Sequence, residues 1–174
     1  MPVPSPRVAG LDQRTTSLDG DEVPWIAVKA QRNADGTESR VWEKWVAVST
    51  DPLYLALFAR WDPGMLVRRH GHLSPHTLVV LDGELRCDGI PHGPGTHLEL
   101  PLGASFGPFE AGPDGVHLYE VMLGDPRSWS DEPEPYAELC AARGVTPLPD
   151  PPIELPAGLE DLRAVFSTPL EEPG

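Results

Sequence analysis

The chain has 174 residues, of which 27 are acidic and 13 are basic, so its formal net charge is −14. This length suits one domain with a single core that needs neither disulfides nor a structural metal. The acidic balance argues against a nucleic-acid binder, which needs a basic surface to displace counterions, and against binding to an anionic membrane. We therefore predict a small-molecule partner, with no nucleic acid and no membrane.

The expected location is the cytoplasm. No apolar run reaches the roughly 18 residues of a membrane span, and the Pro-rich beginning of the chain lacks the apolar segment of a secretory signal. Cys87 and Cys140, the two cysteines, are interpreted as free thiols of a reducing compartment. Neither cysteine is given a catalytic role.

Prolines crowd both ends of the chain, whereas in the middle glycines and prolines separate short apolar runs. This distribution indicates turns between strands rather than disorder. We expect three segments: an irregular Pro-rich arm over 1–24, a β-barrel over 25–124, and a helical and Pro-rich extension over 125–174.

Short strands at regular spacing are predicted through the middle segment. In chain order they are 40–48, 53–61, 65–72, 77–81, 84–87, 96–100 and 115–123. The dipeptide Asp82-Gly83 predicts a tight hairpin between the fourth and the fifth, because this pair favours the turn types that join antiparallel strands. Many short strands with Gly and Pro turns are typical of an all-β sandwich or barrel.

The pattern changes beyond Gly124. Residues 131–142 place Tyr136, Leu139 and Cys140 at helical spacing, with acidic residues at the start and Arg143-Gly144 at the end. This pattern predicts one amphipathic helix. A second helix is expected over 156–166.

The histidines are clustered, since all six lie within the 48 residues from His70 to His117. His70 and His72 point the same way if they lie on a strand, because side chains alternate faces. His76 follows a predicted turn at Pro75, which lets the next strand return with His76 on the same side. Three neutral imidazoles from neighbouring strands predict a facial metal site, and imidazole suits Zn, Cu, Fe and Ni alike.

The spacing around these histidines resembles the first motif of the cupin superfamily, Gly-x5-His-x-His-x3/4-Glu-x6-Gly. This sequence has Gly64, His70, His72, His76 and Gly83 at those positions. Every spacing matches, but the Glu position holds a histidine.

The second cupin motif, Gly-x5-Pro-x-Gly-x2-His-x3-Asn, is similar to a second stretch of the chain. Here Gly95, Pro101 and Gly103 match, but Phe106 replaces the histidine and Glu110 the asparagine. The two motifs and their flanking strands cover about the middle half of the chain. The resemblance implies an all-β, cupin-type double-stranded β-helix, or jelly-roll barrel, with its ligand site inside and one or two C-terminal helices added.

The resemblance also implies a function. Cupin enzymes commonly hold a metal with three His and one Glu, so His70, His72 and His76 would be the ligands here, as in the three-His iron dioxygenases in ligand type but not in ligand position. A neutral shell favours an anionic, chelating substrate. We expect one divalent metal, with Fe(II) favoured and Zn, Ni or Mn possible, in a dioxygenase-like oxidoreductase. The alternatives are a Zn, Ni or Mn lyase or isomerase and a cupin that binds a small ligand or metal without turnover.

Four further residues are candidates for substrate binding, and none is assigned a catalytic role. Arg68 shares a face with His70 and suits a substrate carboxylate, and the alternative is an internal ion pair with an acid such as Glu120 or Glu99. Phe106 would either close the pocket with an apolar ring that can stack on a flat substrate or pack in the core. The other two candidates, on the last predicted strand, are His117 and Tyr119.

Some residues keep two interpretations. His97 is either a distant ligand or base or an exposed side chain, and Glu110 is expected in a solvated loop. The resemblance further implies a homodimer, because cupins often pair through strand exchange, and Trp42, Trp45 and Trp61 are candidates for its interface.

Overall fold

The structure, a computed structural model, describes residues 14–50, 52–130 and 132–153. In these ranges almost all of the regular structure is strand. The strands are β1 (Ile26–Arg32), β2 (Glu38–Thr50), β3 (Leu53–Trp61), β4 (Leu66–Val67), β5 (Gly71–Leu73), β6 (His76–Cys87), β7 (Ile90–His92), β8 (His97–Leu100), β9 (Phe109–Met122), β10 (Asp125–Trp129) and β11 (Thr146–Pro147). One helix, α1 (Pro133–Arg143), follows β10.

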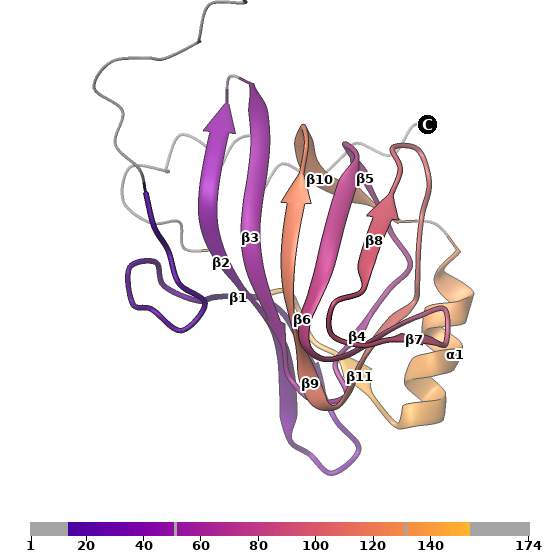
Figure 1. Cartoon of the computed structure of the whole chain (residues 1–174). Helices are drawn as coiled ribbons and strands as arrows, with labels where there is room; N and C mark the ends of the chain where they lie inside the picture. The colour runs from indigo at the N-terminus through magenta and orange to yellow at the C-terminus, as the bar shows by residue number, and fades with distance from the viewer. Residues whose placement is uncertain (1–13, 51, 131, 154–174) are drawn as a thin grey trace, which may run out of the picture.

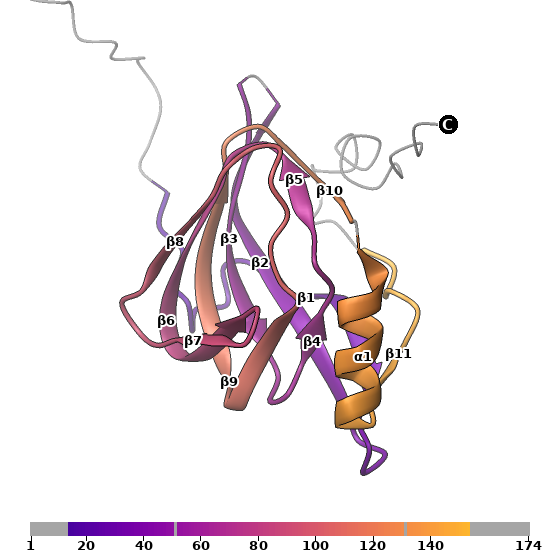
Figure 2. The same ribbon diagram turned by 90° about the vertical axis from the view of Figure 1, so that its right-hand side faces the viewer.

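The strands form two antiparallel sheets. The large sheet has the order β11-β1-β2-β3-β9-β6-β7, with β4 also paired to β9 and β8 to β6, and the small sheet pairs β10 with β5. Figure 1 shows β2, β3, β9, β6 and β8 as one layer, and Figure 2 shows β4, β5, β10 and α1 on the opposite side. This is the all-β jelly roll that the sequence predicted.

Alternation along the central strands places the core between the layers. On β9, Val116, Leu118 and Met122 are buried while the alternate residues His117, Tyr119 and Val121 are half-buried, as a strand with one face inward requires. Burial of such side chains supplies the main driving force for this fold. Glu120 shares that buried face with them, so a carboxylate is carried into the apolar interior.

Most predicted strands are present, but the hairpin at Asp82-Gly83 was wrong. β6 runs through both residues, with register shifts on either side of them in its pairing to β9. Gly83 has a φ of +76°, and a Cβ there would lie 2.2 Å from the Gly115 carbonyl oxygen. Glycine is therefore required by a bulge and a close backbone approach, not by a turn.

The sequence predicted fewer of the strands at the ends of the barrel. β1, β7, β10 and β11 were not predicted, and the stretch 65–72 is divided between β4 and β5. The predicted helix 131–142 is present as α1, whereas the second expected helix, 156–166, lies outside the described residues. No helix in the described part of the chain is long and apolar enough to cross a membrane.

Lys44 is fully buried on the outer face of β2. Its ammonium donates to three carbonyl oxygens, those of Ser17 at 3.2 Å, Leu18 at 2.8 Å and Gly20 at 2.6 Å, and lies 5.0 Å from the centre of the Trp25 ring. A buried charge needs such partners to offset its desolvation. Lys44 therefore holds the segment before β1 against the sheet.

Candidate functional site

A cavity of about 290 Å³ opens inside the barrel. Its walls come from both sheets, from β1, β2, β3, β4 and β9 of the large sheet and β5 and β10 of the small one, and from the segment that follows β11. The apolar part of the wall consists of Val28, Val41, Trp45, Leu55, Trp61, Val67, Met122, Pro126, Pro151 and Ile153. A cavity of this size suits a small organic molecule.

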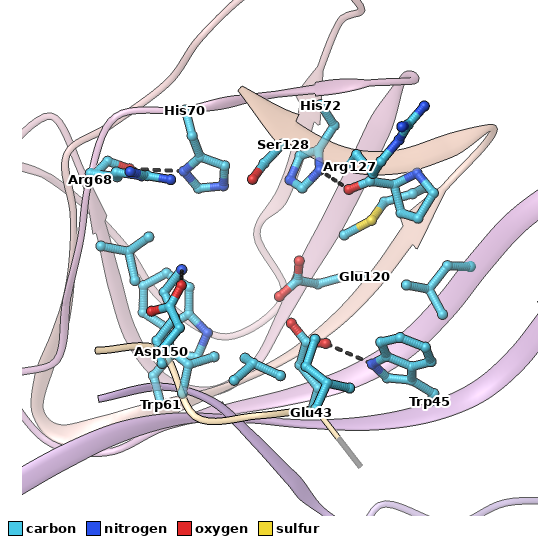
Figure 3. A pocket seen from close by; sticks show the side chains of 18 of the residues that line it. Glu43, Trp45, Trp61, Arg68, His70, His72, Glu120, Arg127, Ser128 and Asp150 are labelled. Atoms are coloured by element: carbon cyan, nitrogen blue, oxygen red, sulfur yellow. Dashed lines mark hydrogen bonds and ion pairs between the residues drawn. The ribbon is translucent and has the colours of Figure 1, made fainter. Parts of the chain in front are cut away.

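His70 and His72 reach the cavity from β5 and the residue before it, as the sequence predicted from their spacing. Their ring centres are 5.2 Å apart. Position 71 between them requires glycine, because a Cβ there would lie 2.4 Å from the Ala104 carbonyl oxygen. In Figure 3 the two imidazoles enter the cavity from one edge, and Glu120 and Glu43 point toward them from the other side.

Both imidazoles are anchored by their Nδ1 atoms to backbone carbonyl oxygens. His70 donates to the Arg68 oxygen at 2.8 Å, and His72 to the Pro126 oxygen at 2.7 Å. A carbonyl oxygen only accepts, so Nδ1 carries the proton and Nε2 keeps a free lone pair. This arrangement is the one that metal-binding histidines use, because a bond at one nitrogen fixes the ring and its tautomer.

The cavity also keeps these two rings neutral. Burial lowers the pKa of His70 to about 3, with the nearby His72 adding to the effect. Burial likewise lowers the pKa of His72 to about 4, with His76 contributing. Neutral imidazoles are the form that binds a metal ion or accepts a hydrogen bond.

His76 does not line the cavity. It is 3% exposed, and its Nε2–H donates to Glu120 Oε2 at 2.9 Å, while its Nδ1 is buried without a hydrogen-bond partner among the described residues. Its ring centre lies 4.8 Å from that of His72. Glu120, and not His76, therefore presents the third donor group to the cavity beside His70 and His72.

Glu43 is a second carboxyl group in the cavity wall, and the sequence interpretation missed it. It lies on β2 between Val41 and Trp45, both of which also line the cavity. The Trp45 indole N–H donates to Glu43 Oε2 at 2.7 Å. Burial raises the pKa of Glu43 to about 7, and the charge of Glu120 acts in the same direction.

Three cationic side chains reach the cavity wall in a protein that is acidic as a whole. Lys29 forms an ion pair with Asp150 at 2.9 Å, and Arg127 is bonded to the carboxylate of Asp125. Arg68 is exposed at the rim of the cavity. Neither of the ion pairs considered for Arg68 is present: Glu120 is bonded to His76, and Glu99 is exposed on β8.

The structure does not bring the other substrate-binding candidates to the cavity wall. Phe106 lies directly opposite His70 through two backbone hydrogen bonds of 3.0 and 2.9 Å, but its ring packs on the core. His117 and Tyr119 alternate with the buried residues of β9 and so face outward, where Tyr119 contacts Phe58. The register of β9 thus turns Glu120 inward in their place.

The positions of four other residues bear on the roles considered for them from the sequence. His97 is exposed on β8. Glu110 is not in a solvated loop but in β9, where it forms an ion pair of 2.8 Å with Arg143 of α1. Trp45 and Trp61 cannot form a dimer face, because both are buried and line the cavity.

The donor atoms are of the right chemical kind for a metal, but they are not gathered around one point. Among the described residues, no group of three His, Cys, Asp or Glu side chains is assembled as a metal site. One oxygen of the Glu120 carboxylate, Oε2, already accepts the hydrogen bond from His76. The predicted metal site therefore stays a prediction, for which two preset imidazoles and a nearby carboxylate fit the donor chemistry.

Comparison with known proteins identifies the fold. No known family profile matches the sequence, and no curated protein matches it. Among solved structures, a candidate acetylacetone dioxygenase from Methylibium petroleiphilum is 13% identical with a TM-score of 0.54, over 92% of this chain and 100% of that one. An RmlC-like cupin from Ralstonia eutropha is 15% identical with a TM-score of 0.49, over 78% and 93%. The polyketide cyclase RemF from Streptomyces resistomycificus is 17% identical with a TM-score of 0.47, over 83% and 84%.

At these identities the likeness shows the fold alone. The chain shares the fold of the Methylibium petroleiphilum structure, a jelly roll, with a cavity inside its barrel and His70 and His72 in the cavity wall. The jelly-roll fold that the sequence predicted is thereby confirmed. Two of the neighbours are named as enzymes, and their names do not transfer a reaction to this chain.

Proposed function

We propose that this protein is a metal-dependent enzyme that oxidises or cleaves a small organic anion in its barrel cavity. One observation carries the proposal: two neutral imidazoles with free Nε2 lone pairs share the cavity wall with the carboxylate of Glu120. Two histidines and one carboxylate with open positions are the ligand set of non-haem Fe(II) oxygenases. Fe(II) is therefore the favoured ion, with Zn, Ni and Mn as alternatives.

His70, His72 and Glu120 would hold the ion. His76, the third ligand expected from the sequence, is a positioning residue in this proposal, because its hydrogen bond orients the Glu120 carboxylate. When bound, the ion supplies Lewis-acid chemistry and, as Fe(II), the redox chemistry of a reaction with O₂.

The cavity wall favours an anionic ligand with an apolar body. Arg68 offers a guanidinium at the rim, where it suits a carboxylate or an enolate. The valines, Leu55 and Met122 of the wall suit a hydrocarbon part. Two of the three ligands are neutral, so a bound anion would also offset the remaining charge of the ion.

Metal content tests the proposal first. The untagged protein, His72→Ala and the matched control His97→Ala, which removes an exposed histidine, are analysed by plasma mass spectrometry. We expect near-stoichiometric metal in the wild type and the control and little in His72→Ala. Iron would then justify an oxygen-consumption screen with carboxylates and β-diketones. Equal metal content in all three proteins would contradict the proposed site.

Two further variants separate the roles of Glu120 and His76. If Glu120 is the ligand, Glu120→Gln loses the metal, while His76→Gln weakens metal affinity by about 10- to 100-fold, the usual effect of removing an outer hydrogen bond. Loss of metal in His76→Gln with retention in Glu120→Gln would restore His76 as the third ligand.

A second candidate function is supported by Glu43. A half-buried carboxyl group with a pKa of about 7 is suited to accept and return a proton, which lyases and isomerases need. Under this alternative the metal would be Zn, Ni or Mn, and turnover of an enolisable substrate would proceed without oxygen. Metal without turnover under either condition would favour a cupin that only binds its ligand.

The expected homodimer and cytoplasmic location remain predictions. Light scattering on the purified chain tests the dimer. A monomeric mass across the micromolar range would contradict it.

A further inference from the structure

Ser128 places an uncommitted hydroxyl group in the wall of the cavity. The residue belongs to β10, is exposed, and is one of those that line the cavity. Among the described residues its hydroxyl has no hydrogen-bond partner. Ser130, two residues further on, differs in this respect, because its hydroxyl donates to the Arg69 carbonyl oxygen at 2.7 Å. The sequence interpretation did not consider Ser128.

The register of the small sheet directs Ser128 into the cavity. Ser128 lies directly opposite His72, and residues so paired on antiparallel strands project from the same face, with Cβ atoms roughly 4.5–5.5 Å apart. The next residue, Trp129, faces the other way, since its ring would lie 2.8 Å from a Cβ on Gly71. In Figure 3 the Ser128 hydroxyl lies between the imidazoles of His70 and His72 and points into the cavity.

A bulge in β10 produces this arrangement. Between Asp125 and Ser128, β10 contains two residues more than the stretch of β5 that pairs with it. One of them, Pro126, supplies the carbonyl oxygen that anchors His72 Nδ1 at 2.7 Å. The other, Arg127, bonds back to the Asp125 carboxylate through its backbone N–H at 3.0 Å and its Nε–H at 2.9 Å. Bulges beside binding sites re-aim side chains, and this one sets both the anchor of an imidazole and the free hydroxyl.

Ser128 is a donor at an edge of the cavity where donors are scarce. The two imidazoles beside it present only lone pairs at Nε2, because their Nδ1–H groups are bonded to backbone carbonyl oxygens. Of the cationic side chains in the wall, Lys29 and Arg127 are held by carboxylates, and Arg68 is exposed at the rim. A hydroxyl group can donate one hydrogen bond, so it suits an acceptor atom of a ligand that binds next to the imidazoles.

We propose that Ser128 is a ligand-binding residue that selects oxygen anions, namely carboxylates and enolates, by donating its hydroxyl hydrogen to the oxygen that the ligand presents to His70 and His72. The inference rests on the proposed function, because a metal ion held by these imidazoles is what attracts an anionic oxygen to this edge. It adds a residue that is not a metal ligand and that favours oxygen over sulfur, which accepts hydrogen bonds only weakly.

Anion titration of the cobalt-loaded protein tests this. The full-length wild type, Ser128→Ala and Ser128→Thr are loaded with Co(II), whose visible absorption changes when an anion binds to it. Benzoate and acetylacetonate are the oxygen probes, and thiophenolate, in mildly alkaline buffer, is a sulfur probe of similar size to benzoate. We expect Ser128→Ala to bind at least one oxygen probe about tenfold or more weakly than the wild type and thiophenolate with unchanged affinity. Ser128→Thr keeps the hydroxyl and should restore most of the affinity.

Ser130→Ala is the matched control. It removes a hydroxyl from the same stretch of chain, but one that is already bonded to the Arg69 carbonyl oxygen. It should bind all three probes as the wild type does. Plasma mass spectrometry should find the same cobalt content in every variant, because Ser128 is not a proposed metal ligand. Loss of cobalt in Ser128→Ala alone would overturn the inference, since the serine would then serve the metal or the bulge.

The other outcomes that overturn the inference differ in what else they refute. Equal affinity of the wild type and Ser128→Ala for the oxygen probes, with cobalt bound to both, refutes the role of Ser128 and leaves the proposed function standing. An equal loss of benzoate and thiophenolate affinity in Ser128→Ala shows packing rather than a hydrogen bond. Absence of cobalt from the wild type refutes the proposed metal site, and with it the inference.

Discussion

Glu43 gives the sharpest test of the cavity, because a half-buried carboxyl group with a raised pKa should make stability depend on pH. Its surroundings raise its pKa from 4.5 to about 7, mainly through burial. In the unfolded chain the same group would ionise near its ordinary value. The folded state therefore holds the proton more tightly than the unfolded state does.

The sign and size follow from this difference. Between pH 4.5 and 7 the unfolded chain releases the proton first, so the free energy of unfolding falls as pH rises, and above pH 7 the loss stays constant. At roughly 1.4 kcal/mol for each factor of ten in the ionisation constant, the full loss is about 3 kcal/mol. The protein therefore keeps this stability at low pH, where Glu43 is protonated in both states, and loses it at high pH.

Replacing the carboxyl group isolates the effect. Glu43→Gln cannot ionise but keeps an oxygen acceptor for the Trp45 N–H. In urea unfolding with EDTA present, we expect the variant to match the wild type near pH 4.5 and to exceed it by about 3 kcal/mol at pH 8. Glu99→Gln, an exposed carboxyl group on β8, is the control and should follow the wild type throughout. Parallel curves for Glu43→Gln and the wild type would refute the reasoning.

Three further substitutions test how the cavity is supported. Gly71→Ala should lower stability by about 2 kcal/mol or more and abolish metal uptake, because its Cβ would lie 2.4 Å from a backbone carbonyl oxygen. Thermal unfolding and metal analysis measure the two effects, and wild-type values for both would contradict the prediction. Lys44→Met should cost about 2–4 kcal/mol and speed proteolysis within 17–20, since three carbonyl groups lose their donor. Arg143→Ala should lower stability by less than about 1 kcal/mol, because its ion pair is half exposed; a larger loss in urea unfolding would show that α1 depends on it.

The sequence located the fold and the His-x-His pair because both depend on local spacing. His70 and His72 share a face whatever the rest of the barrel does, and the glycines and prolines of the two cupin motifs lie at turns and close approaches. The strands β1 and β10 escaped prediction for the same reason. Their sequences, IAVKAQR and DPRSW, carry polar residues on both faces and are ordered by pairing with β2 and β5.

Strand β9 shows where prediction from local spacing fails, because spacing alone does not say which alternate residues face inward. The chemistry of His117 and Tyr119 makes them candidates for the site, yet the face of β9 is decided by the apolar residues Leu118 and Met122, which must be buried. Glu120 is carried inward with them. The signal was present in the sequence, since a single carboxylate alternating with large apolar side chains indicates either a buried polar network or a site.

The alternation of faces that turns Glu120 inward on β9 also turns Glu43 inward on β2. On β2, Val41, Glu43 and Trp45 share the inward face, so the strand that builds the apolar wall also brings a carboxyl group into it. The carboxyl groups of Glu43 and Glu120 lie across the cavity from the imidazoles of His70 and His72, and Arg68 is exposed at the rim. The strand faces that bury the apolar wall thus also decide which polar groups enter the barrel.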